Sequence, residues 1–179
     1  MPIQSLYELT HWNLKVTPPG ASPVAQIPKG MVTDLTMPTL ERDMDTTKRA
    51  GELGVVARPK FYNELEMSFT LKYVYRELIE ALLRGTNESI TVEATSCLQP
   101  DSGTPKAYKV LGKGFVSSLP FGDLSADGFE SEITMMCWYM EAVLDTTTII
   151  YDPRNYVLSI GGTNLFEGVK TIIDPPAAP

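Results

Sequence analysis

The sequence predicts a mainly β, antiparallel fold with one flanking α-helix, and two observations support this prediction. Residues 64–71 alternate strictly between polar and apolar side chains, the pattern of a strand with one buried face. Apolar residues then recur at spacings of three and four over 75–83, the stripe of an amphipathic helix, with Gly85 placed to end it. With further alternating segments along the chain, we expect a β-sandwich or barrel-like sheet of six or more strands and a helix at about 72–84.

Length and charge limit the possible organisation and partners. The 179 residues predict a single domain over 1–173, followed by a disordered tail at 174–179 that contains three prolines. Asp and Glu outnumber Lys and Arg 22 to 15, which gives a net charge of −7. Because DNA binding depends on Lys and Arg that neutralise phosphates, such a surface is expected to repel DNA rather than hold it.

The cysteines and the amino terminus indicate the compartment. Cys97 and Cys137 are the only two cysteines, and both lie in apolar, strand-like segments, so we expect core residues rather than a disulfide. The first five residues lack the order of a signal peptide, and no stretch approaches the ~18 apolar residues of a membrane-spanning helix. We therefore expect a soluble protein that folds in a reducing cytoplasm and does not bind a membrane.

The amino-terminal part predicts two strands around a proline-rich connector. Residues 12–16 alternate briefly and predict the first strand. The connector at 18–28 is too rich in proline for a helix or a central strand. Residues 31–37 predict a second strand, on which Asp34 and Thr36 share the polar face.

A long charged segment at about 40–58 separates this strand from the next. Residues 41–52 are dense in both signs of charge and poor in apolar side chains. Because such a segment cannot bury itself, it predicts a long surface loop, and long loops in compact domains are usually functional or disordered.

The strand at 64–71 combines a buried face with an acidic, hydroxyl-rich face. Its apolar residues fall on one side because side chains alternate along a strand. Its polar residues fall on the other, namely Glu64, Glu66, Ser68 and Thr70. We expect this polar face to meet water.

The second half predicts several further strands. A hairpin is expected from 89–97 and 108–118, in which Gly112 and Gly114 leave one face bare for a close backbone approach. After a turn cluster at 120–128, a long strand spans 130–144 and returns through 148–151. A last hairpin is expected from 156–160 and 165–173 around a Gly-Gly turn.

The residues offer no catalytic constellation and no cofactor site. A catalytic triad could use only His11, the single histidine, which lies near the start of the chain, and we do not expect catalysis from it. One histidine and two strand-borne cysteines also fall short of the about four ligands of a zinc site. Residues 123–128 begin like a calcium loop, but the twelfth position is Thr134 instead of a bidentate glutamate. Carboxylates on an open strand face remain simply ionised. We therefore expect no enzyme activity, no metal and no cofactor.

The order of the expected elements resembles the major tail tube protein of contractile-tailed bacteriophages or of related phage-tail-like particles. The resemblance covers about 12–169. It depends on residues 32–40, the charged loop through 49–51, the alternating strand at 64–71, and 130–152 with its Trp-Tyr pair.

This resemblance implies a structural virion protein. Hexameric rings, whose sheets join into one continuous barrel, would stack into a hollow tube inside a contractile sheath and conduct DNA through a negatively charged lumen during genome ejection. The implied partners are other copies of the chain, a tail sheath protein, a tape-measure (ruler) protein and a baseplate initiator, with DNA only as cargo that does not stick. The implied location is the virion tail, assembled in the cytoplasm of the bacterial host.

The resemblance also gives roles to two sets of residues. The lumen-facing candidates are Asp34, Thr36, Glu64, Glu66, Ser68 and Thr70. The inter-ring stacking candidates in the charged loop are Arg42, Asp43, Asp45, Lys48, Arg49 and Glu52. Two alternatives stay open at this point: the tube subunit of a DNA-free contractile bacteriocin or injection system, and a ligand-binding β-barrel protein whose polar face lines a pocket.

Overall fold

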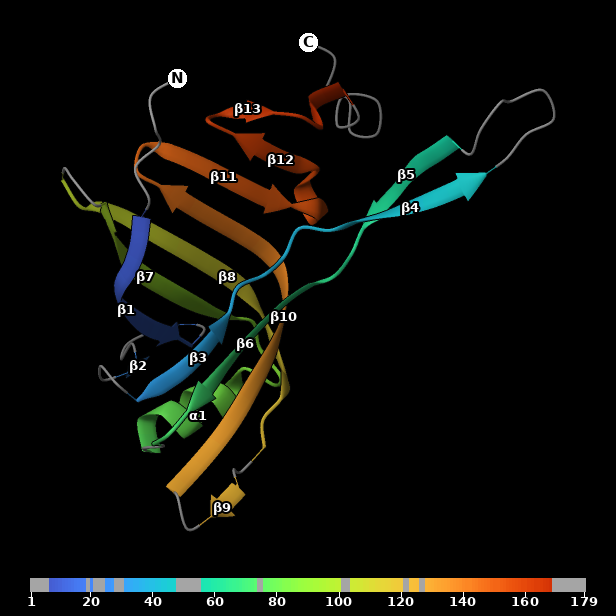
Figure 1. The fold of residues 1–179 in the computed structure, drawn as a ribbon. Helices are drawn as coiled ribbons and strands as arrows, with labels where there is room; N and C mark the ends of the chain where they lie inside the picture. Colours follow the sequence, from blue (N-terminus) through green and yellow to red (C-terminus); the bar gives the residue numbers. More distant parts are fainter. Residues whose placement is uncertain are drawn as a thin grey trace.

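The computed structural model shows an antiparallel β structure with a flanking helix (Figure 1). It describes residues 7–18, 20, 25–27, 31–47, 56–73, 76–100, 104–120, 123–125 and 128–168. The expected tail at 174–179 therefore lies outside the described residues.

The predicted strands up to residue 160 are present, with ends that differ from the expected ones by a few residues. The strands are β1 (Tyr7–Thr17), β2 (Ala25–Gln26), β3 (Val32–Thr36), β4 (Arg42–Thr47), β5 (Val56–Tyr62), β6 (Leu65–Leu71), β7 (Ile90–Pro100), β8 (Lys106–Ser118), β9 (Asp123–Ser125), β10 (Gly128–Leu144), β11 (Thr147–Asp152), β12 (Val157–Ile160) and β13 (Thr163–Asn164). The helices are α1 (Arg76–Arg84) and the short 3-10 helix η1 (Pro153–Asn155).

Strand β10 organises the main sheet. The main sheet has eleven described strands: eight follow the order β13-β12-β11-β10-β8-β7-β1-β2, β6 and β9 also pair with β10, and β3 pairs with β6. One edge of β10 is shared, because β6 pairs with its residues 131–137 and β11 with residues 140–144. Strand β8 follows the opposite edge. The sheet is not closed into a barrel within the described residues, so the barrel-like part of the prediction is corrected to a strongly curved, open sheet (Figure 1).

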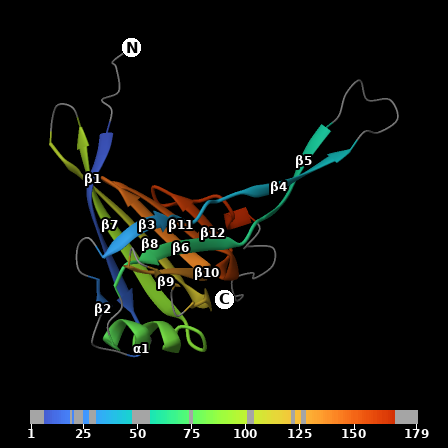
Figure 2. The ribbon, with the colours of Figure 1, turned by 60° about the horizontal axis from the view of Figure 1, so that its bottom comes forward.

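The hydrophobic core lies inside this curved sheet, and helix α1 covers one end of it. Figure 2 shows α1 across the ends of β1 and β7. Leu78, Ala81 and Leu82 are the buried side chains of the helix. The helix begins at Arg76, later than the expected 72, because 72–73 form an exposed connection after β6.

The described parts of the charged segment are strands rather than the predicted loop, while 48–55 lie outside the described residues. Strands β4 and β5 form a separate two-stranded sheet that projects away from the main sheet in both views (Figures 1 and 2). The prediction equated a lack of apolar residues with a loop, but the backbone hydrogen bonds of a hairpin do not require a core. Pro59 is tolerated in β5 because a two-stranded sheet leaves one side of each strand free. We call β4–β5 the arm.

The carboxy-terminal hairpin is shorter than predicted. Strand β12 turns at Gly161 and Gly162, both with positive φ, as the expected tight turn requires. The returning strand β13 has only two residues, and 165–168 do not continue it. Residues 169–173 lie outside the described residues. The turn cluster at 120–128 contains the short strand β9, which pairs with the start of β10.

The predicted close backbone approach is confirmed at Gly114, while Gly112 faces side chains instead. A Cβ atom added to Gly114 would lie 2.0 Å from the carbonyl oxygen of Met136 in β10, and one added to Gly112 would lie 2.9 Å from Cys137 Sγ. Next to this contact β10 contains a bulge, because Cys137 pairs with Gly114 but Tyr139 pairs with Lys113. The strand therefore requires glycine at position 114.

Gly114→Ala is expected to lower the free energy of unfolding by about 3 kcal/mol, because the added methyl group meets backbone rather than a flexible side chain. Urea denaturation measures the change. Gly168→Ala is the matched control, since nothing lies within 4 Å of its added Cβ. A Gly114→Ala variant as stable as this control would contradict the close approach.

The thiol of Cys137 is expected to resist modification in the folded protein. The residue is 9% exposed, and desolvation raises its pKa to about 12, so the reactive thiolate is rare at mildly alkaline pH. In a Cys97→Ser variant, Ellman's reagent should detect no thiol before denaturation in guanidinium chloride and one thiol afterwards. Rapid reaction of the folded variant would show that this part of the core opens.

Candidate functional site

The alternation predicted for 64–71 is confirmed in β6. The apolar residues of the strand are buried, with Leu65 and Phe69 each 1% exposed. On the opposite side, Glu66 is exposed and Ser68 and Thr70 are half-buried. The strand therefore presents a polar face to solvent, as its sequence pattern indicates.

Strand β3 extends this polar face. In the antiparallel register Asp34 lies opposite Thr70, and Thr36 lies opposite Ser68. Residues directly opposite each other in antiparallel strands share a face. Glu64 is exposed one residue before β6 and continues the alternation. The structure thus brings together the six residues that the sequence analysis named as lumen-facing candidates.

Strand β10 contributes residues that the sequence analysis missed. Glu132 lies opposite Thr70, Thr134 opposite Ser68, and Met136 opposite Glu66. The signal was present, because residues 130–136 also alternate between the two faces. What was missing was the pairing of this strand with β6. We call the combined surface the acidic face; it consists of Asp34, Thr36, Glu64, Glu66, Ser68, Thr70, Glu132 and Thr134.

The carboxylates of the acidic face are not balanced by cations. Among the described residues, no salt bridge joins Asp34, Glu64, Glu66 or Glu132 to a Lys or Arg side chain. At the end of the face, Lys72 Nζ lies 3.9 Å from Glu130 Oε1, with both side chains more than half exposed. Such an exposed pair contributes little stability. The four carboxylates therefore give this surface a net negative charge.

The other half of the same outer surface differs, because lysines lie among its carboxylates. On β7 and β8, Lys109 Nζ lies 2.8 Å from Glu93 Oε2. Lys113 Nζ lies 4.6 Å from the centroid of the Tyr139 ring, and the Tyr139 hydroxyl donates a hydrogen bond to Glu141. Burial and this hydrogen bond raise the pKa of Tyr139 to about 12. Among the described residues, the outer faces of β3, β6 and the first half of β10 therefore carry carboxylates without the lysines found on β8.

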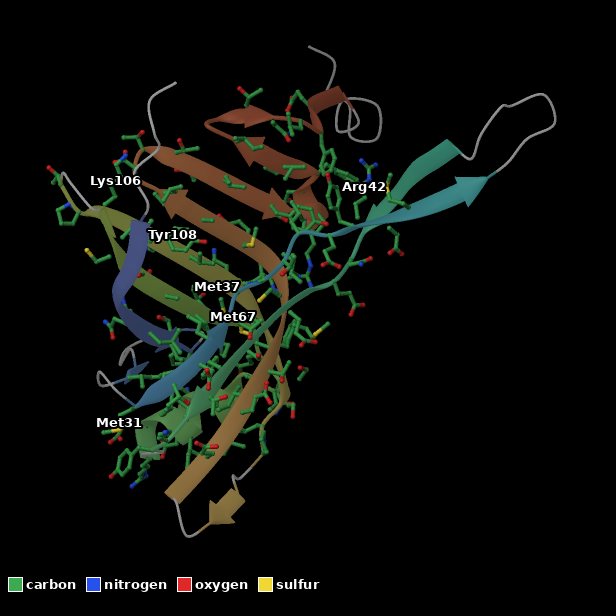
Figure 3. The ribbon with its side chains drawn as sticks, viewed as in Figure 1. Met31, Met37, Arg42, Met67, Lys106 and Tyr108 are labelled. Carbon is green, nitrogen blue, oxygen red and sulfur yellow. The ribbon has the colours of Figure 1, made fainter. Side chains whose placement is uncertain are left out.

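The arm presents part of the second predicted set of residues. Arg42 and Asp43 are exposed, and Asp45 belongs to β4. Figure 3 shows Arg42 at the base of the arm. The remaining stacking candidates lie outside the described residues, namely Lys48, Arg49 and Glu52.

An aromatic cluster at the base of the arm was not predicted. Tyr62 is the last residue of β5. The centroid of its ring lies 5.5 Å from the ring centroid of Tyr151 and 6.0 Å from that of Phe166. The Arg42 guanidinium lies 5.2 Å from the Tyr62 ring. These residues are distant in sequence, so no local pattern could have revealed the cluster.

The described residues contain no group of three or more His, Cys, Asp or Glu side chains arranged to hold a metal ion. Asp123 and Ser125, which opened the calcium-like sequence, belong to strand β9. Within the described part of the chain, no helix has the length and apolar character that crossing a bilayer requires. The arrangement consists of a charged surface and a projecting arm, both suited to contacts with other macromolecules.

Comparisons with known proteins agree with this architecture. One solved structure with a similar fold is described as a cryo-EM structure of the anti-feeding prophage baseplate, 6-fold symmetrised; it has a TM-score of 0.52 and 12% identity, and the match covers 80% of this chain and 96% of that chain. No curated protein sequence matches. The family model described as phage tail tube protein FII matches residues 26–173, most of the chain. The chain therefore belongs to the phage tail tube protein FII family.

Proposed function

We propose that this chain is the structural subunit of a phage tail tube, in which hexameric rings stack into a hollow tube inside a contractile sheath. The acidic face is the observation that carries the finer part of this proposal. In the tube it lines the lumen, through which DNA passes during genome ejection. The protein acts as a building block rather than an enzyme.

The free edge of β3 supports ring formation. Within the described residues β3 pairs only with β6, so its other edge has unpaired backbone groups. Such an edge is a template for a strand of another chain. If each copy pairs this edge with its neighbour, the strands of the acidic face continue around the ring. The baseplate with a similar fold is described as 6-fold symmetrised, which supports six copies.

The charge of the acidic face suits a DNA conduit. Phosphates bind where Lys and Arg release their counterions, and this face offers carboxylates and hydroxyl groups instead. Six copies around a ring repeat the same four carboxylates without matching cations. DNA therefore slides through the lumen without being held.

The arm supplies the contact between rings. A two-stranded hairpin is marginally stable by itself in water, so a second surface must cover it in the assembly. Its charged residues form the inter-ring contacts, with Arg42, Asp43, Asp45, Lys48, Arg49 and Glu52 as candidates. Exposed ion pairs are individually weak, so stacking depends on several of them acting together.

The assembled tube defines the partners and the location. A sheath protein surrounds it, a tape-measure protein sets its length, and a baseplate initiator starts its growth. The subunit is assembled in the bacterial cytoplasm and ends in the virion tail. A tube in a DNA-free particle would use the same rings and arm but would not need a lumen that repels DNA.

Deleting residues 43–51 is expected to leave a folded, soluble subunit that forms no tubes, because the arm loses most of β4 and its connection to β5. Negative-stain electron microscopy in the presence of a tail initiation complex shows the tubes, and circular dichroism checks the fold. Tubes of normal length from this variant would contradict the stacking role.

The double variant Glu66→Lys/Glu132→Lys reverses two carboxylates of the acidic face. It is expected to increase the DNA retained inside purified tubes by about tenfold or more. The reason is that the face loses its net negative charge and gains two lysines, which release counterions when they bind phosphates. The DNA that survives nuclease treatment of the tubes is measured, since DNA in the lumen is protected.

Glu77→Lys/Glu88→Lys is the matched control, because it changes the net charge equally at exposed positions in and after helix α1. Equal amounts of protected DNA in both double variants would show that the acidic face does not line the lumen.

A further inference from the structure

The direction of the arm must be set at its base. The arm extends beyond the main sheet in both views (Figures 1 and 2), so its outer part does not rest on the rest of the chain. Where the arm joins the main sheet, Asn63 N donates a hydrogen bond of 2.9 Å to Glu41 O. This backbone hydrogen bond closes the two connections, and Leu40, just before the arm, packs against the core.

Tyr62 provides the additional contacts at this point. Its ring is half-buried and meets Tyr151 edge-on, with an angle of 60° between the ring planes, and it packs against Phe166 on the main sheet. Arg42, its partner in the β4–β5 register, places a guanidinium over the same ring. Aromatic pairs and cation–π contacts both depend on orientation, so together they favour one position of the ring.

The residues that receive Tyr62 are themselves held in place. Tyr151 is 5% exposed and pairs with Leu158 in the β11–β12 register. Asn164 Oδ1 accepts hydrogen bonds of 3.1 Å from both Phe166 N and Leu158 N. This amide therefore fixes the turn that carries Phe166 to the strand beside Tyr151. Tyr151 and Phe166 thus form a well-supported contact surface for the Tyr62 ring, which we call the seat.

Beside this seat lies a hollow of about 590 Å³. The residues that line it include Tyr62, Asn63 and Glu64 from the segment that leaves the arm, and Trp138 and Arg154 from the main sheet and η1. The segment that leaves the arm therefore has open space on one side. Without the contacts of Tyr62, the arm could rotate towards this space at 63–64.

We propose that Tyr62 is a positioning residue that fixes the direction of the arm before assembly. The proposal rests on the proposed function, in which the arm contacts the next ring. A subunit with a fixed arm joins a growing tube without first losing the conformational entropy of a freely rotating arm. Removing the Tyr62 ring frees the arm and slows tube growth, while the main sheet remains intact.

The first test measures the arm in the unassembled subunit. Spin labels are placed on the arm at Met44→Cys and on the main sheet at Ile160→Cys, both exposed positions, in a Cys97→Ser background. Pulsed electron paramagnetic resonance then gives the distribution of distances between the labels. One narrow distribution is expected with Tyr62 and with Tyr62→Phe, which keeps the ring. A broad distribution is expected with Tyr62→Ala and also with Phe166→Ala, which removes one wall of the seat.

The second test measures tube growth by the unlabelled variants. Tyr62→Ala is expected to slow growth by about tenfold, because the free energy of two aromatic contacts corresponds to about that factor in rate. Tyr62→Phe, which keeps the ring, should grow normally. Leu165→Ala, a change at an exposed position on the same turn, is the matched control and should also grow normally. Thermal melting confirms that all variants are folded.

Two outcomes would overturn the proposal. A narrow distribution in both Tyr62→Ala and Phe166→Ala would show that other contacts hold the arm. A broad distribution with unchanged tube growth would show that the direction of the arm does not control assembly. Deletion of 43–51 tests the stacking role separately, so tube growth without the arm would refute the proposed function whatever the spin labels show.

Discussion

The structure depends on the pairing of β10 with β8 across Gly114. Strand β10 has 17 residues and serves β6 and β11 on one edge and β8 on the other. Its bulge at Trp138 lies between the segments that pair with β6 and with β11, and the two backbones approach too closely there for a side chain at position 114. Trp138 then connects the bulge to its surroundings, because its Nε1 donates to Ser89 Oγ at 3.2 Å and the Arg154 guanidinium lies 4.5 Å from its ring centroid. A bulge bends a strand and increases its twist, which allows one sheet to curve around the core.

In this curved sheet, alternate residues of the same strand serve either the core or the charged outer surface. The core needs only every second residue of β6 and of the first half of β10, and those residues are the buried aliphatic, aromatic and sulfur-containing side chains. The intervening residues remain free to carry charge, and here they include the carboxylates of the acidic face. Because these carboxylates are exposed to water, their mutual repulsion costs the fold little. In contrast, the outer surface of β7 and β8 includes an ion pair and a lysine placed over an aromatic ring. Two electrostatic environments therefore coexist on one side of a continuous sheet.

The sequence predicted whatever depends on local pattern. Alternation correctly identified β6, its polar face and the bare stripe at Gly114, because a strand repeats every two residues whatever its neighbours are. It could equally have identified Glu132 as an outward residue of β10, but not its place beside Thr70, which only the register determines. The arm was mistaken for a loop because its sequence contains few apolar residues to give an alternation. The aromatic cluster joins Tyr62 to Phe166, about a hundred positions apart, so it follows from topology and from no local pattern.

The acidic face and the arm belong to one continuous segment of chain, which has a consequence for assembly. Strand β5 ends at Tyr62 and β6 begins at Leu65, so only Asn63 and Glu64 separate the arm from the strand at the centre of the acidic face. A rotation of this strand about its axis therefore also moves the base of the arm. In the proposed tube, β6 is oriented by the pairing of β3 with the neighbouring copy, while the seat of Tyr62 transmits that orientation to the arm. Ring formation and ring stacking are then mechanically coupled, because a subunit whose sheet is correctly joined to its neighbours also presents its arm in the direction that the next ring requires.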